Sequence, residues 1–287
     1  MKSIDSLLPI GAVAITVIAS VTLFSQSQSI PTTQPDGNIA IPITDGSMLV
    51  QMVGTTSTLH VLLRSRMDGE IVRLDSQGRI LDRTPVHRQT LSFAVAPTGA
   101  VTTLRRHGPK SFVSGPLFDS LRPITEREVP AALERLTILG GRPVGVEASS
   151  ISTDLNLTET GTIPLNVLAP HRTTPLPDGS LAIIASKDPT LWKLDAGGHL
   201  SAPVKLIAPE LEHFQPSDTH LAVYDAVSLR NGDLILAASP YNPEEGARLV
   251  RFDANGNLKT LMRLLMPEFP ELVGIAGGRL RVSKLAM

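Results

Sequence analysis

Short apolar runs alternate along the chain with turns rich in glycine, aspartate and asparagine. Between Met48 and Arg83, for example, four such runs are joined by tight turns. Apolar runs of this length between turn residues predict β-strands, and four strands joined in sequence form one small antiparallel sheet. The pattern continues towards the C-terminus, so we expect an all-β chain built from repeated four-stranded sheets.

One pattern recurs three times: a basic residue, an apolar residue, Asp, two small or polar residues, Gly, any residue, and an apolar residue. The copies are Arg73–Ile80, Lys193–Leu200 and Arg251–Leu258. The aspartate side chain can cap its own turn, and the glycine supplies the positive φ that a tight hairpin requires. These aspartates are therefore interpreted as turn residues of a repeated unit, and not as a carboxylate site.

The spacing of the copies gives the size of the unit. Asp75 and Asp195 are 120 residues apart, which fits three units of about 40 residues each. Two less regular units therefore lie between them, at Leu91–Leu117 and Leu136–Leu168. Asp195 and Asp253 are 58 residues apart, which indicates an insertion in one unit. We place that insertion at Ala208–His220.

The five units end at Leu264, and only Leu272–Ile275 and Arg279–Leu285 remain as apolar runs. Asn38–Ile43 can supply an outer strand to these two, because a propeller closes when both ends of the chain share one blade. The sequence therefore predicts a six-bladed β-propeller over residues 38–287, with five or seven blades as alternatives. Pro123–Arg135 interrupts the strand pattern, and we expect a short helical excursion there.

The N-terminal region predicts a membrane anchor within residues 1–24. Leu7–Phe24 is a run of 18 uncharged residues, which as a helix would span roughly 27 Å, close to the hydrocarbon thickness of a bilayer. Lys2 precedes the run and no Lys or Arg follows it before Arg64. The positive-inside rule then places the N-terminus in the cytoplasm and the propeller in the periplasm or outside the cell.

A cleaved signal peptide is the alternative for this region, because Ser25-Gln26-Ser27 offers small residues at the positions that a signal peptidase requires. In the preferred interpretation the run is an uncleaved signal-anchor. Ser25–Gly37 is polar and contains two prolines, so residues 25–37 are expected to be a semi-extended linker between the membrane and the propeller.

Composition narrows the classes of function. The formal net charge is −1, which gives no indication of a nucleic-acid partner or a polybasic membrane surface. The chain has no cysteine, which excludes disulfides, thiolate metal sites and a catalytic cysteine. None of the seven histidines has a metal-ligand spacing, and we predict no metal and no cofactor.

The hairpin pattern resembles the NHL-type repeat of six-bladed propellers. The resemblance is carried by Leu176–Leu200 and Leu229–Leu258, and less completely by Met67–Ile80. In each, an apolar strand leads to Asp-Gly or Asn-Gly, a second apolar strand, and then the Asp-x-x-Gly turn. The resemblance implies a propeller whose family members serve as binding platforms, sensors, structural subunits or hydrolases, and the fold does not select among them.

Two groups of residues are candidates for chemistry or contact. Lactonase-type propellers hold a central Ca²⁺ with acidic and amide oxygens, and the polar residues available near strand ends are Glu147, Asp154, Asn156, Asp225 and Asn231. Irregular segments outside the repeat are better candidates for a partner-binding surface, and their aromatic residues are Phe112, Phe118, Phe214 and Tyr241. Trp192, in a repeat strand, is expected to pack between blades.

The preferred hypothesis is a non-enzymatic, membrane-anchored propeller that binds protein as a scaffolding or accessory subunit of an integral membrane protein complex, for example a photosynthetic or respiratory one. Anchoring raises the effective concentration of the propeller beside its partner. The alternatives are a periplasmic calcium-dependent lactonase or hydrolase, and a ligand sensor.

Overall fold

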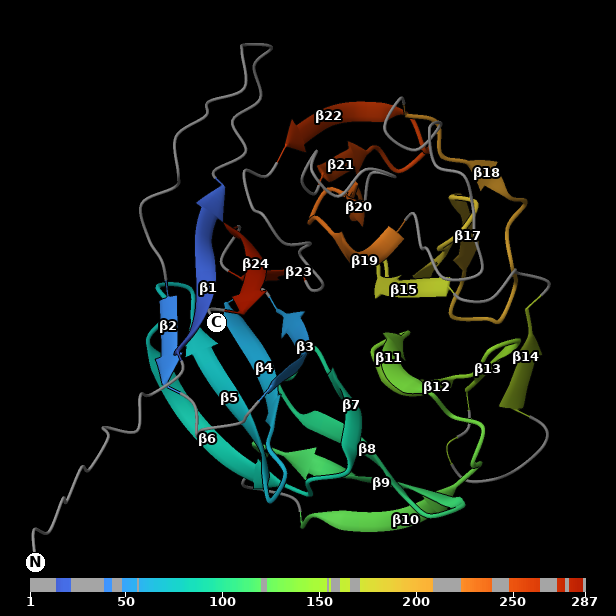
Figure 1. Cartoon of the computed structure of the whole chain (residues 1–287). Helices are drawn as coiled ribbons and strands as arrows, with labels where there is room; N and C mark the ends of the chain where they lie inside the picture. The colour runs from blue at the N-terminus through green and yellow to red at the C-terminus, as the bar shows by residue number, and fades with distance from the viewer. Residues whose placement is uncertain are drawn as a thin grey trace, which may run out of the picture.

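The computed structural model is an all-β protein in which the strands form four-stranded antiparallel sheets around a central axis (Figure 1). No described residue belongs to a helix that is long and apolar enough to cross a membrane. The structure describes residues 14–21, 39–42, 48–55, 57–119, 123–153, 155, 161–165, 171–208, 223–238, 248–263, 273–276 and 279–285.

Five blades are built from consecutive strands, each with its first strand innermost. Their strands agree with the apolar runs from which the units were predicted.

The first blade contains β3 (Met48–Gly54), β4 (Thr58–Arg64), β5 (Gly69–Asp75) and β6 (Ile80–Val86). The second contains β7 (Thr90–Val95), β8 (Val101–His107), β9 (Lys110–Leu117) and β10 (Thr125–Val129). The third contains β11 (Arg135–Leu139), β12 (Arg142–Val146), β13 (Ser150–Ser152) and β14 (Thr162–Pro164). The fourth contains β15 (His171–Pro175), β16 (Leu181–Ala185), β17 (Thr190–Leu194) and β18 (Val204–Lys205); the fifth contains β19 (Val223–Ser228), β20 (Leu234–Ala238), β21 (Arg248–Phe252) and β22 (Leu258–Arg263).

Both ends of the chain contribute to one further sheet. Its strand order is β2-β1-β24-β23, with β1 at Ala14–Val21, β2 at Ile39–Pro42, β23 at Val273–Ala276 and β24 at Arg279–Leu285. As predicted for Asn38–Ile43, β2 is the outermost strand of this sheet. The fold is therefore a β-propeller, with five blades of consecutive strands where the sequence predicted six blades in all.

At the N-terminus, the structure describes part of the run that was predicted to be a membrane anchor. Within Leu7–Phe24, residues 14–21 form strand β1, which pairs with β2 and with β24. This strand is rich in β-branched residues, which favour an extended backbone over a helix. The remaining residues of the run, and the linker at 25–37, lie outside the described residues, so the membrane anchor stays a prediction.

The helical excursion predicted at Pro123–Arg135 is wrong, because β10 forms the outer strand of the second blade there. The two faces of β10 alternate as in any strand, but both carry charge because an outer strand is exposed to solvent. Its acidic residues pair across the sheet, with Arg105 Nη2 lying 2.6 Å from Glu126 Oε1 and Lys110 Nζ lying 2.9 Å from Glu128 Oε2. Charges spaced in this way resemble the surface of a helix when only the sequence is considered.

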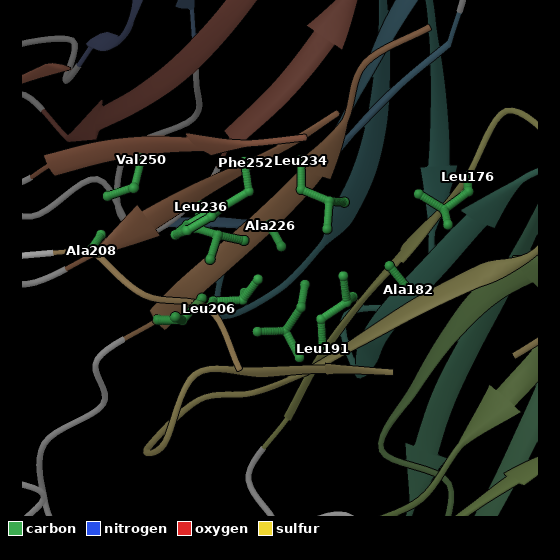
Figure 2. Close-up of a cluster of buried hydrophobic side chains, with 13 residues drawn as sticks. Leu176, Ala182, Leu191, Leu206, Ala208, Ala226, Leu234, Leu236, Val250 and Phe252 are labelled. Carbon is green, nitrogen blue, oxygen red and sulfur yellow. The ribbon is translucent and has the colours of Figure 1, made fainter. Parts of the chain in front are cut away.

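Among the described residues, one hydrophobic cluster lies between each neighbouring pair of blades from the first to the fifth. Figure 2 shows the cluster between the fourth and fifth blades, where Leu191 and Leu206 lie close to Ala226 and Leu236. Strand β16 explains the continuous apolar runs of the sequence. Its odd-numbered residues pack towards the third blade and its even-numbered residues towards the fifth, so that all five are buried.

The three Asp-x-x-Gly segments form the predicted turns. In the third copy, Asp253 Oδ1 accepts hydrogen bonds from Asn255 N at 2.8 Å and from Asn257 N at 2.9 Å, and Gly256 has a φ of 85°. Hydrogen bonds from residue 257 are the main cause that lowers the pKa of Asp253. Asp75 and Asp195 cap their turns in the same way and also have lowered pKa values. The aspartates are therefore confirmed as turn residues.

In the second and third copies of the repeat, the glycine also allows the turn to approach the preceding blade. A Cβ atom added to Gly256 would lie 2.7 Å from Val204 Cγ1, in the outer strand of the fourth blade. A Cβ added to Gly198 would lie 3.3 Å from Ile163 Cδ1, in the outer strand of the third blade. The repeat is therefore both a hairpin turn and a contact between blades.

The inner strands are tied to one another by side chains. An inner strand is the edge of its sheet, so its outward backbone groups need partners from the neighbouring blade. Gln51 of β3 accepts a hydrogen bond from Phe93 N of β7 at 2.9 Å and donates one to Phe93 O at 3.0 Å. Ser92 of β7 donates to Gln51 Oε1 at 2.9 Å and accepts from Leu136 N of β11 at 3.1 Å.

The same arrangement continues around the ring. Arg135 of β11 donates from Nη2 to the carbonyl oxygen of His171 in β15. Ser228 of β19 donates to the carbonyl oxygen of Pro175, at the end of β15. Each neighbouring pair of inner strands from β3 to β19 is thus joined by at least one hydrogen bond between a side chain of one strand and the backbone of the other.

Replacing Gly256 by alanine should destabilise the protein by about 2–4 kcal/mol. The change adds the strain of a left-handed backbone to an overlap with Val204 that requires the blades to move apart. Gly99→Ala is the matched control, because Gly99 has a φ of 86° and no atom within 4 Å of the added Cβ. Urea unfolding should show the larger loss for Gly256→Ala, and equal losses would contradict the contact between blades.

Replacing Gln51 by leucine should destabilise the protein by about 1–3 kcal/mol, because the backbone groups of Phe93 lose their partner while remaining away from water. Gln77→Leu changes the same atoms at an exposed turn and should have little effect. Urea unfolding of the two variants compares the two sites directly. A Gln51→Leu variant as stable as Gln77→Leu would show that the inner strands do not depend on this tie.

Candidate functional site in the central cavity

The inner strands surround a cavity of about 970 Å³ on the axis of the propeller. It is lined by residues of β3, β7, β11, β15 and β19 and by the hairpin turns that follow several of these strands. Many lining atoms are apolar, including those of Val50 and Ile138. A concave, partly apolar cavity with a few polar groups is the usual form of a small-molecule site.

One level of the cavity is polar. We call it the polar layer, and it consists of Gln51, Ser92, Arg135, Arg172 and Asp225, all of which line the cavity. The hydrogen bonds between inner strands place the first three at the same height. The hydrogen bond between Ser228 and Pro175 aligns β19 with β15. Asp225 stands three residues before Ser228, and Arg172 stands three residues before Pro175. Asp225 and Arg172 therefore lie at matching heights on neighbouring strands.

Irregularities in strand pairing precede three residues of the polar layer and influence where their side chains point. The pairing register shifts between Leu49 and Gln51, between Thr90 and Ser92, and between Val223 and Asp225. A β-bulge adds a residue on one strand and re-aims the side chain that follows it. Three blades therefore use the same device, a bulge near the start of the inner strand, immediately before the polar residue.

Arg135 is the most constrained charge of the layer. It occupies the first position of β11, and its Nε is buried without a hydrogen-bond partner among the described residues. Burial, and then the positive charge of Arg172, lower the pKa of Arg135 to about 10. Asp225 and Glu134 act in the opposite direction. Arg135 therefore keeps its charge at neutral pH, although it is held in an unfavourable position.

His171, the residue before Arg172 on β15, lies in the same positive environment. Its ring is buried, and neither ring nitrogen has a hydrogen-bond partner among the described residues. Burial lowers the pKa of His171 to about 4, and the charges of Arg135 and Arg172 contribute to this. His171 is therefore neutral at pH 7, and the two arginines provide the positive charge at this end of the cavity.

The aromatic residues predicted as partner contacts lie in two situations. Phe112, on β9, packs beneath Arg105, whose guanidinium carbon lies 4.3 Å from the ring centroid. Phe118 is half-buried between the first and second blades, with Arg73 at 5.0 Å and the His60 ring at 5.9 Å from its ring centroid. Phe214 and Tyr241 lie outside the described residues. The partner-binding role of these four residues stays a prediction.

The described residues considered for a calcium site have separate surroundings. Glu147 follows β12 and accepts a hydrogen bond from Ser150 Oγ at 2.7 Å, whereas Asp225 lies on an inner strand and lines the cavity. Asn231 belongs to the turn after β19, where its Oδ1 accepts from Asp233 N at 3.2 Å. Asp154 and Asn156 lie outside the described residues. Within the described ranges, no group of three or more histidine or acidic residues could hold a metal ion.

The sequence predicted the packing of Trp192 but missed most of the polar layer. Trp192 packs against the core between the third and fourth blades, as expected. Asp225 was singled out only as a calcium candidate, and the two arginines were not singled out at all. A usable signal exists, since both arginines stand within the first two residues of an innermost strand, where an apolar residue would otherwise line the cavity.

No family model matches the chain, and no curated protein matches its sequence. Solved structures resemble it in fold. A protein of unknown function from Bacteroides caccae has a TM-score of 0.56 at 11% identity, with 88% of this chain and 94% of that chain covered. A virginiamycin B lyase from Staphylococcus aureus has a TM-score of 0.54 at 12% identity, with 87% and 85% covered. A streptogramin B lyase has a TM-score of 0.51 at 10% identity, with 83% and 93% covered. Identities this low show the fold alone, and together with the strand arrangement they establish that the chain is a β-propeller.

Proposed function

We propose that the protein acts by binding a small ligand in its central cavity, as a ligand-binding or sensing propeller. The observation that carries this proposal is the polar layer inside a cavity of about 970 Å³. Such a volume accommodates a metabolite-sized molecule. The bulges and the hydrogen bonds between inner strands hold the polar groups in place before a ligand arrives, which reduces the entropy cost of binding.

The chemistry of the layer suits recognition better than catalysis. Arginine stays protonated at neutral pH and offers several directed donors. Gln51 and Ser92 already use their side chains to join neighbouring strands. These groups can orient a ligand, whereas a general acid or base needs a pKa near the working pH. The protein-binding role predicted from the sequence concerns other surfaces, and it stays a second proposal with a membrane complex as the partner.

We also propose that the terminal sheet closes the propeller as its sixth blade. Its strand β23 contacts β3 and β19, which are the inner strands on either side of the gap. A blade shared by the two ends of the chain would leave the ring with no open edge. This proposal assigns residues 14–21 to the propeller instead of to a membrane helix.

Filling the cavity should abolish ligand binding and leave the fold intact. Thr173 lines the cavity on β15, and Thr173→Trp places an indole in the space that a ligand would occupy. Thr162→Trp, on the exposed outer strand β14, is the matched control. Saturation-transfer NMR with succinate, putrescine and glucose would detect binding of an anionic, a cationic or a neutral molecule.

We expect at least one of these probes to bind to the wild-type protein and to Thr162→Trp, and to be lost from Thr173→Trp. If none of the probes binds, or if binding survives in Thr173→Trp, the cavity is not the binding site. Circular dichroism on each variant checks that the fold is retained.

Deletion of residues 1–45 tests the sixth blade. It removes β1 and β2 and exposes the edge of β24, so we expect a clearly lower melting temperature. Deletion of residues 1–12 retains both strands and serves as the control. If both truncated proteins melt at the same temperature, the N-terminal segment is not part of the propeller, and the anchor predicted from the sequence becomes the better account.

A further inference from the structure

We propose that the ligand of the central cavity is a small organic or inorganic oxyanion, bound through a carboxylate or phosphate group by Arg172 and Arg135. This inference rests on the ligand-binding function proposed above and adds the chemical class of the ligand. Guanidinium groups recognise both oxyanions by paired N–H···O hydrogen bonds, so the two sources share one chemistry.

The described lining of the cavity carries an excess of positive charge. Among the described residues, the lining residues that carry a formal charge are three arginines, Arg135, Arg172 and Arg230, and one aspartate, Asp225. The polar layer contains two of these arginines and the carboxylate, and Arg230 lies in the turn that follows β19. The cavity is therefore positive, and field lines are concentrated inside a cavity with partly apolar walls.

Holding Arg135 and Arg172 near each other is electrostatically unfavourable. Arg135 and Arg172 repel each other, and the effect of Arg172 on Arg135 is opposed by Asp225 and by Glu134, which is exposed to solvent. An oxyanion between the two guanidinium groups would replace that repulsion by attraction. Arg135 also keeps a buried Nε without a partner among the described residues, and an unpaired buried donor is unfavourable until a ligand accepts from it.

Hydrogen bonds to the backbone hold charged groups of the polar layer in position. Arg135 is fixed by its hydrogen bond to the His171 carbonyl oxygen. Asp225 accepts a hydrogen bond from Ala226 N at 2.9 Å, which orients the carboxylate on β19. His171 adds no further positive charge at neutral pH, so the attraction depends on the arginines.

Isothermal titration at pH 7 and constant ionic strength, with inorganic phosphate and succinate as separate probes, tests the proposal. We expect one or both to bind to the wild-type protein, and the comparison between them distinguishes a phosphate ligand from a carboxylate ligand. Arg172→Gln should weaken binding about tenfold or more, as expected for the loss of a hydrogen bond to a charged group. Arg127→Gln removes the same charge from the exposed outer strand β10 and should bind as the wild type does.

Asp225→Asn provides a test in the opposite direction. Asparagine retains the oxygen that accepts from Ala226 N but removes the negative charge, so binding of the anion should become about fivefold tighter. A merely structural role for Asp225 would weaken binding or leave it unchanged. This variant keeps the proposal testable if Arg172→Gln fails to fold.

The proposal is overturned if neither phosphate nor succinate binds, if Arg172→Gln binds as the wild type does, or if Asp225→Asn does not bind more tightly. Binding of putrescine or glucose that is lost in Thr173→Trp would leave the cavity as a ligand site while showing that its ligand is not an anion. Failure of the oxyanion can thus be told apart from failure of the site.

Discussion

The structure depends on how the exposed edges of the inner strands are covered. In every blade the first strand is an edge, and its backbone groups face the neighbouring blade near the axis. Side chains of Gln51, Ser92, Arg135 and Ser228 bond to those backbone groups. The same side chains occupy the wall of the cavity, so the interactions that join neighbouring inner strands from β3 to β19 also make the interior polar.

Much of the fold could be predicted from the sequence because each copy of the repeat contains residues that form a specific turn. Asp253 and Gly256 form a turn that few other residues could form. The prediction failed at β10, where both faces of the exposed outer strand carry charge and so resemble the surface of a helix. The uncharged, β-branched run of β1 satisfies the criteria for a membrane span as well as those for a strand, so the sequence alone does not decide between them.

The candidate site was less predictable, since it is created by register. Asp225 follows a bulge in its strand. Arg135 and Arg172 are neighbours only because the inner strands of adjacent blades are aligned by their hydrogen bonds. Sequence spacing carries no information on this alignment, because the residues come from different blades. A charged residue among the first residues of an innermost strand is the signal to seek in other propellers, where an apolar residue is expected.

A structure of the full-length protein determined with and without phosphate tests the central claim most directly. The account predicts phosphate between the guanidinium groups of Arg135 and Arg172, inside a ring whose inner strands keep the same positions in both states. Phosphate found only on the outer surface, or a cavity closed by rearranged inner strands, would contradict it.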